Sequence, residues 1–317
     1  MLSGTPLELL LLAGGIVALY GGAELLVAGA GRLAIGIGLR AATVGVTVIA
    51  FATTAPELFV STIGALNVSS DIGLGTIVGS NIANIGLVLG VAAIIKPLEV
   101  SDRLLRRHVP VMVLAALLLV GLGANGRVGR LEGTLLLAVL AGFTGLILHY
   151  ANADSAPMVD EPDADAAKSG VSVRDVALVV GGLVALVVGS RWLVAGGTGL
   201  LSALGVSDLV IGLTVLALGT SLPELAASVV GAIRGHAAFA VGNVVGSNIY
   251  NILAVLGVVA LITPIEVAPA TLRFELPIMI GFTVLLVGLM GYRRRLSRID
   301  GVILVVGYVG FLALLVP

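Results

Sequence analysis

Long apolar runs, separated by short polar or turn segments, alternate along the whole chain. A run of about 20 apolar residues can cross a bilayer as a helix, whereas a barrel strand is shorter and alternates in polarity. The pattern predicts an all-α membrane protein with ten transmembrane helices. The first run starts at Leu7 without a basic leader, so we interpret it as a spanning helix and not as a cleaved signal. We place the helices near residues 7–33, 38–66, 71–95, 106–124, 130–150, 173–199, 205–233, 237–262, 273–291 and 299–316.

Composition supports a membrane location. Apolar residues make up 58% of the chain and charged residues 11%, and the mean hydropathy is +1.17. A soluble domain carries about 25% charged residues, so we expect most of this surface to face the lipid bilayer. The chain has no cysteine, which excludes disulfides and thiolate metal sites. Nothing in the sequence predicts nucleic-acid binding, a cofactor or an obligate protein partner.

One acidic segment divides the chain, and the basic residues indicate its orientation. The pattern predicts a first unit at residues 1–151, a solvated linker at 152–172 and a second unit at 173–317. Of the lysines and arginines in connections, 13 fall on odd-numbered connections and three on even-numbered ones. Positive residues collect on the cytoplasmic side, so we expect the linker in the cytoplasm and both termini outside. The three exceptions are Arg127, Arg130 and Arg273.

The two units share a sequence at a constant offset of 167 residues. Thr47–Glu57 matches Thr214–Glu224, and Gly79–Asn84 matches Gly246–Asn251. Over residues 38–100, 29 of 63 positions are identical to their counterparts. This agreement predicts a duplication with five helices in each unit. Because five is odd, the second unit must cross the membrane in the opposite sense, and such inverted repeats are typical of secondary transporters.

Each copy places a glutamate beside a proline inside an apolar run. Pro56 and Pro223 lack the N–H that a helix needs, so we expect a kink that frees carbonyls one turn earlier. A charge at the bilayer centre costs at least about 2.5–3.5 kcal/mol. Glu57 and Glu224 therefore require neutralisation by protons or cations. A purely structural role, with both carboxyls protonated, would not explain the nearby prolines and hydroxyls in both copies.

Hydroxyl and amide side chains accompany each glutamate at helical spacing. Residues three or four apart share one helix face. The expected ligand set contains only oxygen donors, which suits hard cations such as Ca²⁺ and Na⁺ and argues against zinc or copper. The side chains concerned are Thr53, Thr54, Glu57, Ser80 and Asn84 in the first unit and Thr220, Ser221, Glu224, Ser247 and Asn251 in the second. Outside this set, we expect Glu24 and Arg191 to form an internal ion pair or to reach the cytoplasmic interface, and Gly79 and Gly246 to allow close helix contact.

At these two stretches the chain resembles the sodium/calcium exchanger family, within the cation/calcium antiporter superfamily. The matching residues run from Ala52 to Glu57 and Gly79 to Asn84, and again from Gly219 to Glu224 and Gly242 to Asn251. The resemblance covers essentially the whole chain and is to a compact prokaryotic member. It implies an integral protein of a prokaryotic inner membrane that exchanges several Na⁺ for one Ca²⁺ by alternating access.

The resemblance also implies roles for individual residues. Glu57 and Glu224 would bind Ca²⁺. Thr54 and Ser221 would support the glutamates, while Asn84 and Asn251 would line the centre. Flanking Na⁺ sites would be formed by Thr53, Ser80, Thr220 and Ser247 with the carbonyls of Ala50 and Ala217. Some members have an aspartate at the position of Asn251, so this chain has two central carboxylates and not three.

Three other functions compete with Na⁺-driven exchange. A buried glutamate pair can also titrate, which is compatible with proton-coupled Ca²⁺ exchange, and a K⁺-dependent exchanger is a further variant. A cation channel belongs to a different class and would conduct without a counter-ion. An enzyme is disfavoured, because the sequence shows no histidine pair near the glutamates, no aspartate dyad and no nucleophile–base motif.

Overall fold

The structure of the chain is a computed structural model. It describes residues 5–37, 45–54, 57–58, 61–62, 65–66, 70–153, 172–204 and 219–315. Within these residues the fold is helical apart from four strands of two residues each. The α-helices are α1 (Thr5–Ile37), α3 (Ala50–Thr53), α5 (Ser70–Ala83), α6 (Gly90–Ile95), α7 (Val109–Gly123), α8 (Arg130–Ala153), α10 (Val173–Ala203), α13 (Leu222–Ile233), α14 (Ala237–Tyr250), α15 (Gly257–Ile262), α16 (Leu276–Arg293) and α17 (Arg298–Leu315).

Short π-helical segments interrupt or extend several of these helices. They are η1 (Gly45–Ile49), η2 (Asn84–Leu89), η3 (Leu104–His108), η5 (Asn251–Leu256) and η6 (Thr271–Glu275). The helix α5 continues through η2 into α6, and α14 continues through η5 into α15. Isolated π-helical turns inside α-helices occur frequently at functional sites. Here two of them begin at the asparagines of the repeated stretch.

Eight helical spans are long and apolar enough to cross a membrane among the described residues. They lie close to eight of the ten predicted positions. At the second predicted position the structure describes only η1, α3 and short pieces up to residue 66, and at the seventh it describes α13. The rest of both positions lies outside the described residues, as does nearly all of the predicted linker. The prediction of an α-helical membrane protein is confirmed.

Two of the spans form the centre of the molecule. In the most apolar 18-residue window of the spans 74–95 and 237–262, 78% of the residues are buried, whereas the share is 22–39% in the other six spans. The outer spans expose large apolar side chains such as Leu10, Val17 and Leu131. In water such exposure would be unfavourable, but in lipid it is not. The chain is therefore an integral membrane protein whose two central spans carry the repeated Gly-Ser-Asn sequence.

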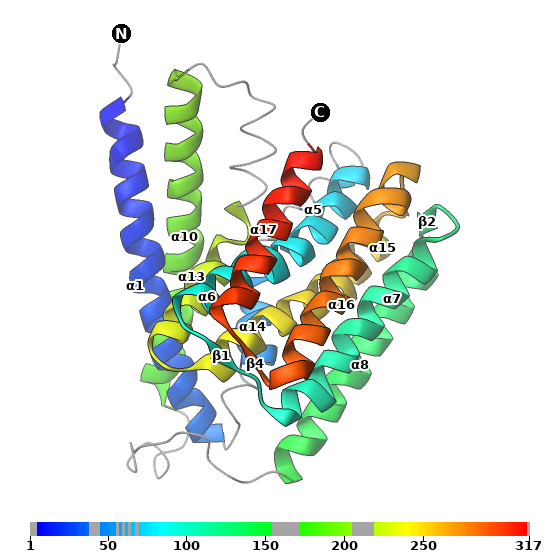
Figure 1. Cartoon of the computed structure of the whole chain (residues 1–317), viewed down its shortest axis with the longest axis horizontal. Helices are drawn as coiled ribbons and strands as arrows, with labels where there is room; N and C mark the ends of the chain where they lie inside the picture. The colour runs from blue at the N-terminus through cyan, green and yellow to red at the C-terminus, as the bar shows by residue number, and fades with distance from the viewer. Residues whose placement is uncertain are drawn as a thin grey trace.

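The helices α1 and α10 lie side by side along their length at one edge of the molecule, where both also contact α13 (Figure 1). Glycines bring their backbones into contact: a Cβ at Gly15 would lie 2.8 Å from the nitrogen of Leu193, and one at Gly22 would lie 2.8 Å from that of Leu186. As the contact residue number rises on α1 it falls on α10, so the two helices are antiparallel. The close approach explains why glycine recurs every seven residues here.

Two small antiparallel sheets join connections from different halves of the chain. In the first, β1 (Leu98–Glu99) pairs with β4 (Arg295–Leu296). In the second, β2 (Arg127–Val128) pairs with β3 (Ile265–Glu266). Each sheet places two connections on the same side of the molecule. Both pairings agree with the sidedness predicted from the basic residues.

The first half of the chain also crosses the central span 237–262 closely. A Cβ at Gly246 would lie 2.5 Å from the carbonyl oxygen of Val46 in η1, so only glycine allows this crossing. The close contact predicted at Gly246 is confirmed. At Gly79 no described atom lies within 4 Å of a Cβ, and the stretch equivalent to η1, residues 212–216, is outside the described residues.

Candidate cation site

The predicted ligands lie at the ends of helical segments. Thr53 is the last residue of α3, and Glu57 follows one turn later. Glu224 occupies the first turn of α13, where the unpaired N–H groups of the helix end favour a negative charge. Asn84 and Asn251 are the first residues of η2 and η5. Helix ends and π-helical turns of this kind are found at functional sites and place polar groups inside a membrane protein where a ligand can reach them.

All but one of the described candidate residues are buried. Glu57 and Glu224 are each 1% exposed although both are acidic. The exception is Thr220, which is partly exposed. The other buried members are Ala50, Thr53, Thr54, Ser80, Asn84, Ser221, Ser247 and Asn251. Of the twelve predicted residues, Ala217 lies outside the described part of the chain.

At this site each glutamate has a hydroxyl neighbour that comes from the other half of the chain. The carboxylate of Glu57 faces the hydroxyl of Thr220 and is repelled by the carboxylate of Glu224. The carboxylate of Glu224 in turn faces the hydroxyls of Thr53 and Ser247. Each glutamate therefore meets a threonine of the other half. The structure brings the two predicted stretches together as one cluster.

Most oxygens of this cluster have no hydrogen-bond partner within the described structure. Buried polar atoms in proteins are almost always paired, and leaving one unpaired costs about 1–3 kcal/mol. A concentration of unpaired oxygens is the arrangement expected where a cation satisfies them. The oxygens are both carboxylate oxygens of Glu57, Oε2 of Glu224, the amide oxygens of Asn84 and Asn251, and the hydroxyls of Thr54, Ser221 and Ser247.

We expected the proline kink to leave the Ala50 carbonyl without a hydrogen bond, but in the structure this carbonyl is paired. It accepts the N–H of Thr54 at 3.0 Å and the Thr53 hydroxyl at 3.3 Å. Both lone pairs are therefore occupied in this conformation. The hydroxyl of Thr53 would have to rotate away before a cation could share this carbonyl. That rotation would free one lone pair of the carbonyl, whereas the lone pairs of the donating hydroxyl are not used in this bond.

The donor set restricts the cations that this site could bind. It combines two carboxylates with neutral oxygens, and no group of three or more histidine, cysteine, aspartate or glutamate side chains occurs in the described residues. Oxygen ligands of this kind suit Ca²⁺ and Na⁺. The formal charge of −2 matches one Ca²⁺ or two Na⁺.

Sequence reasoning missed a second polar layer, one turn beyond the glutamates. Ser61 and Ser228 follow the two glutamates by four residues, and both are 0% exposed. The amide of Asn243, also 0% exposed, donates to the Ser228 hydroxyl at 3.1 Å and to the backbone carbonyl of Glu224 at 3.5 Å. Ser61 and Ser228 are identical at the repeat offset of 167 residues, and this identity could have indicated the second layer from the sequence. Asn243 had no such signal, because its counterpart is Thr76.

Neighbouring asparagines outside the predicted ligand set bond within their own helices. The amide of Asn81 donates to the carbonyl of Ile77 at 2.7 Å, and that of Asn248 donates to the carbonyl of Val244 at 3.1 Å. These bonds hold the side-chain amides along the helix.

The α1–α10 pair contacts the site region through two polar interactions. Ser190 of α10 donates a hydrogen bond to the carbonyl of Gly219, next to Thr220. Glu24 of α1 forms an ion pair with Arg234 at 2.7 Å, just beyond the end of α13. Of the two expectations for Glu24, contact with the membrane interface agrees with this pairing. Arg191, the other residue considered there, is exposed.

Comparisons with known proteins agree with this arrangement. The profile of the family described as sodium/calcium exchanger protein matches residues 7–148 and again 175–316. The inner membrane protein YrbG of Escherichia coli is 35% identical over 277 residues, covering 85% of each chain. The sodium/calcium exchanger MaX1 of Methanosarcina acetivorans is 31% identical over 308 residues, covering 85% of this chain and 87% of its own.

Solved structures show the same fold. The sodium-calcium exchanger NCX_Mj, studied for extracellular ion exchange and binding-site occlusion, superposes with a TM-score of 0.84 at 29% identity. The match covers 98% of this chain and 99% of that one. The duplicated match to the family profile and the agreement of whole-chain structure lead to one conclusion. The chain belongs to the sodium/calcium exchanger family.

Proposed function

We propose that this protein is a secondary active antiporter that exchanges Na⁺ for Ca²⁺ by alternating access, with no cofactor. The observation that carries the proposal is the pair of buried glutamates, surrounded by oxygens without hydrogen-bond partners and contributed by both halves of the chain. Membership of an exchanger family supports the same class of activity. The transported ions themselves would satisfy the unpaired oxygens.

The proposed architecture is ten transmembrane helices arranged as two inverted five-helix repeats. The repeats would be residues 1–151 and 173–317, joined by a cytoplasmic linker at 152–172. Three observations support it: the antiparallel contact of α1 with α10, the two sheets that join opposite halves, and the two separate matches to the family profile. Inversion places the equivalent stretches face to face at the midplane.

Within the site, we propose that Glu57 and Glu224 bind Ca²⁺ directly. The Na⁺ ions would use the hydroxyls and carbonyls around them, with Thr54 and Ser221 supporting the carboxylates and Asn84 and Asn251 lining the centre. The proposed Na⁺ ligands are Thr53, Ser80, Thr220 and Ser247 with the carbonyls of Ala50 and Ala217. The burial and partner exchange of the described members support this assignment.

Charge balance makes the coupling ion the question to test. Two carboxylates neutralise two Na⁺, whereas a third Na⁺ would leave a site of net charge +1. Proton coupling and K⁺ dependence are the alternatives, since a coupled pair of buried carboxylates can also exchange protons.

The proposed location is a prokaryotic inner membrane, with both termini outside. The distribution of basic residues supports this orientation, and a relative named as an inner membrane protein supports the location.

Ca²⁺ flux into proteoliposomes tests the proposal. The full-length protein is reconstituted, and ⁴⁵Ca²⁺ uptake is followed with Na⁺, K⁺ or H⁺ gradients imposed separately. We expect uptake to follow an outward Na⁺ gradient at constant pH and without K⁺. Uptake driven by a pH gradient without Na⁺ would contradict Na⁺ coupling, and uptake without any counter-ion would indicate a channel.

A further inference from the structure

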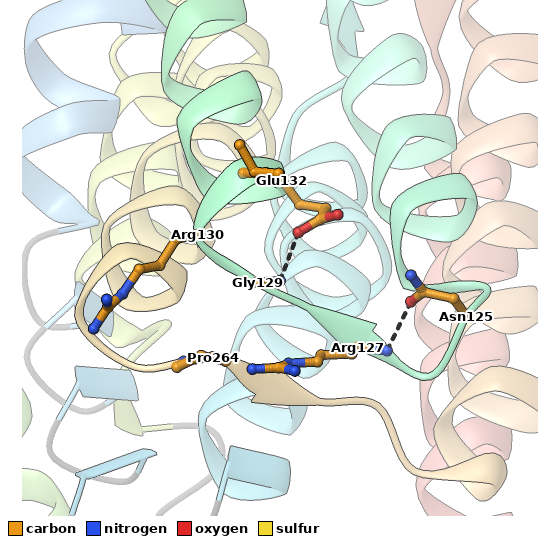
Figure 2. Close-up of a pocket in the computed structure, with 7 residues that line it drawn as sticks. Asn125, Arg127, Gly129, Arg130, Glu132 and Pro264 are labelled. Carbon is orange, nitrogen blue, oxygen red and sulfur yellow. Dashed lines mark hydrogen bonds between the residues drawn. The ribbon is translucent and has the colours of Figure 1, made fainter.

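A pocket opens between β2, the start of α8 and the segment that follows α15 (Figure 2). Its volume is about 530 Å³, and its lining includes Asn125, Arg127, Arg130, Glu132 and Pro264. The side chains of both arginines extend toward the segment that carries Pro264 (Figure 2). The pocket is separate from the cation site, and the proposed transport does not use it.

The pocket lies at the level where two membrane spans end. Arg130 is the first residue of the span 130–147, and Ile262 is the last residue of the span 237–262. The two ends are in contact, because the Nε of Arg130 donates to the carbonyl of Leu261 at 3.2 Å. The end of a span marks the boundary of the hydrocarbon core, which is where lipid headgroups are found.

The arginines of this pocket form no ion pair with a described carboxylate, although Glu132 also lines the pocket and Glu266 is the strand partner of Arg127. Arg127 and Arg130 are both exposed. Glu132 accepts the N–H of Gly129 at 2.9 Å, and Asn125 accepts the backbone N–H of Arg127 at 2.9 Å. The terminal nitrogens of both guanidiniums are left for an external acceptor.

The other two-stranded sheet lacks this property. Beside β4, Arg294 forms an ion pair with Asp102. Arg127 and Arg130 are also two of only three basic residues on the connections that otherwise lack them. Basic residues are disfavoured on that side during insertion. Two unpaired arginines at one pocket on that side therefore point to a ligand.

Exposed apolar side chains lie beside the basic pocket. Leu131 is 83% exposed, Ile262 46% and Leu135 45%. They lie on the two spans whose ends form the pocket, on the side of the hydrocarbon core. A molecule that joins an anionic headgroup to an acyl chain would contact both regions at once.

We propose that this pocket binds the headgroup phosphate of an anionic phospholipid, with Arg127 and Arg130 as donors and the acyl chains along α8 and α15. Arginine suits phosphate because its planar fork can donate two parallel hydrogen bonds. Basic pockets between transmembrane helices on the cytoplasmic side bind anionic headgroups in the same way, and the chemistry of guanidinium and phosphate is the same on either side. The inference is independent of which ion drives Ca²⁺ exchange.

Lipid retention measured by native mass spectrometry tests the proposal. The full-length protein is purified in detergent and titrated with phosphatidylglycerol, phosphatidylcholine or inorganic phosphate. Each arginine near a lipid surface contributes about 1 kcal/mol, which corresponds to about fivefold in affinity. We expect Arg127→Gln to weaken phosphatidylglycerol binding about fivefold and the double variant with Arg130→Gln to weaken it about 25-fold.

Arg273→Gln is the matched control, because Arg273 is exposed on the same side and lies outside the pocket. Equal loss of lipid in this control would overturn the site. Competition by inorganic phosphate at the same concentration as the lipid would show a free-anion site and overturn the lipid assignment, as would equal binding of phosphatidylcholine. Arg127→Gln alone keeps the test valid should loss of the Arg130 bond to Leu261 impair folding.

Discussion

Replacing Glu57 with glutamine removes one of the two charges at the site and preserves the shape of the side chain. Glu57 is 1% exposed, and neither of its carboxylate oxygens has a hydrogen-bond partner in the described structure. The substitution therefore breaks no described side-chain hydrogen bond. Any loss of transport should come from the lost interaction with a cation.

The magnitude follows from Coulomb's law at the contact distance. A carboxylate oxygen about 2.4 Å from Ca²⁺ gains about 14 kcal/mol at an effective dielectric constant of about 20, and with Na⁺ about half of that. Dehydration cancels most of this gain. Removing one partner of a buried ion pair still costs about 3–5 kcal/mol. We expect Ca²⁺ affinity to fall about 150- to 5,000-fold, and Na⁺ affinity to fall less.

The same substitution should not lower the stability of the ion-free protein. A charge at the bilayer centre costs at least about 2.5–3.5 kcal/mol, and here Glu224 adds repulsion. Without bound ions, the Glu57→Gln variant should unfold at a temperature no lower than that of the wild type. Loss of transport with intact stability separates a ligand from a structural residue.

The assay combines ⁴⁵Ca²⁺ uptake in proteoliposomes with calorimetric Ca²⁺ binding and thermal unfolding. Glu99→Gln is the control, because it makes the same chemical change at an exposed position in β1. Wild-type uptake by Glu57→Gln would refute the reasoning. So would a fall in unfolding temperature in ion-free buffer, because it would mean that the charge stabilises the fold.

Three further substitutions test other parts of the structure. Asn251→Asp should make the formal charge of the site −3 and increase the number of Na⁺ ions bound. Calorimetry would detect this as Na⁺ binding that depends more steeply on Na⁺ concentration. An unchanged dependence would argue against a central role of Asn251. Asn243→Ala should cost about 1–3 kcal/mol by leaving Ser228 without its buried donor, and an unchanged unfolding temperature would contradict this. Gly22→Ala should destabilise the α1–α10 contact by about 1–3 kcal/mol, whereas Gly21→Ala, with no described atom within 4 Å, should stabilise the protein by about 0.5–1 kcal/mol in the same unfolding assay.

Hydropathy predicted most of the fold because a bilayer imposes a simple rule. A segment in lipid must be apolar and must satisfy its own backbone, so spanning helices are visible in the sequence. Eight predicted positions match spans of the structure. The positions that contain Pro56 and Pro223 match less completely, since the structure describes α13 but only short pieces around Pro56.

The residue types of the candidate site could be predicted from the sequence, but not which hydroxyl lies beside which carboxylate. Spacing placed hydroxyls on the same face as each glutamate, and the repeat marked both copies. The exchange of Thr53 and Thr220 between the two carboxylates could not be read from either copy. The second bond to the Ala50 carbonyl was also unexpected, because the kink at a proline does not by itself determine which carbonyls lose their partners.

By itself, the sequence predicted the membrane class, which the structure confirms, and it also predicts a duplication, an inverted second unit and an oxygen-only site in the repeated stretch. These properties depend on local hydropathy, residue type and spacing along one helix. Only the tertiary structure decided that Glu24 pairs with Arg234, that Asn243 supports the Glu224 segment, and that Arg127 and Arg130 share a pocket. Such contacts join residues that are distant in sequence, and their partners are set by how the helices pack.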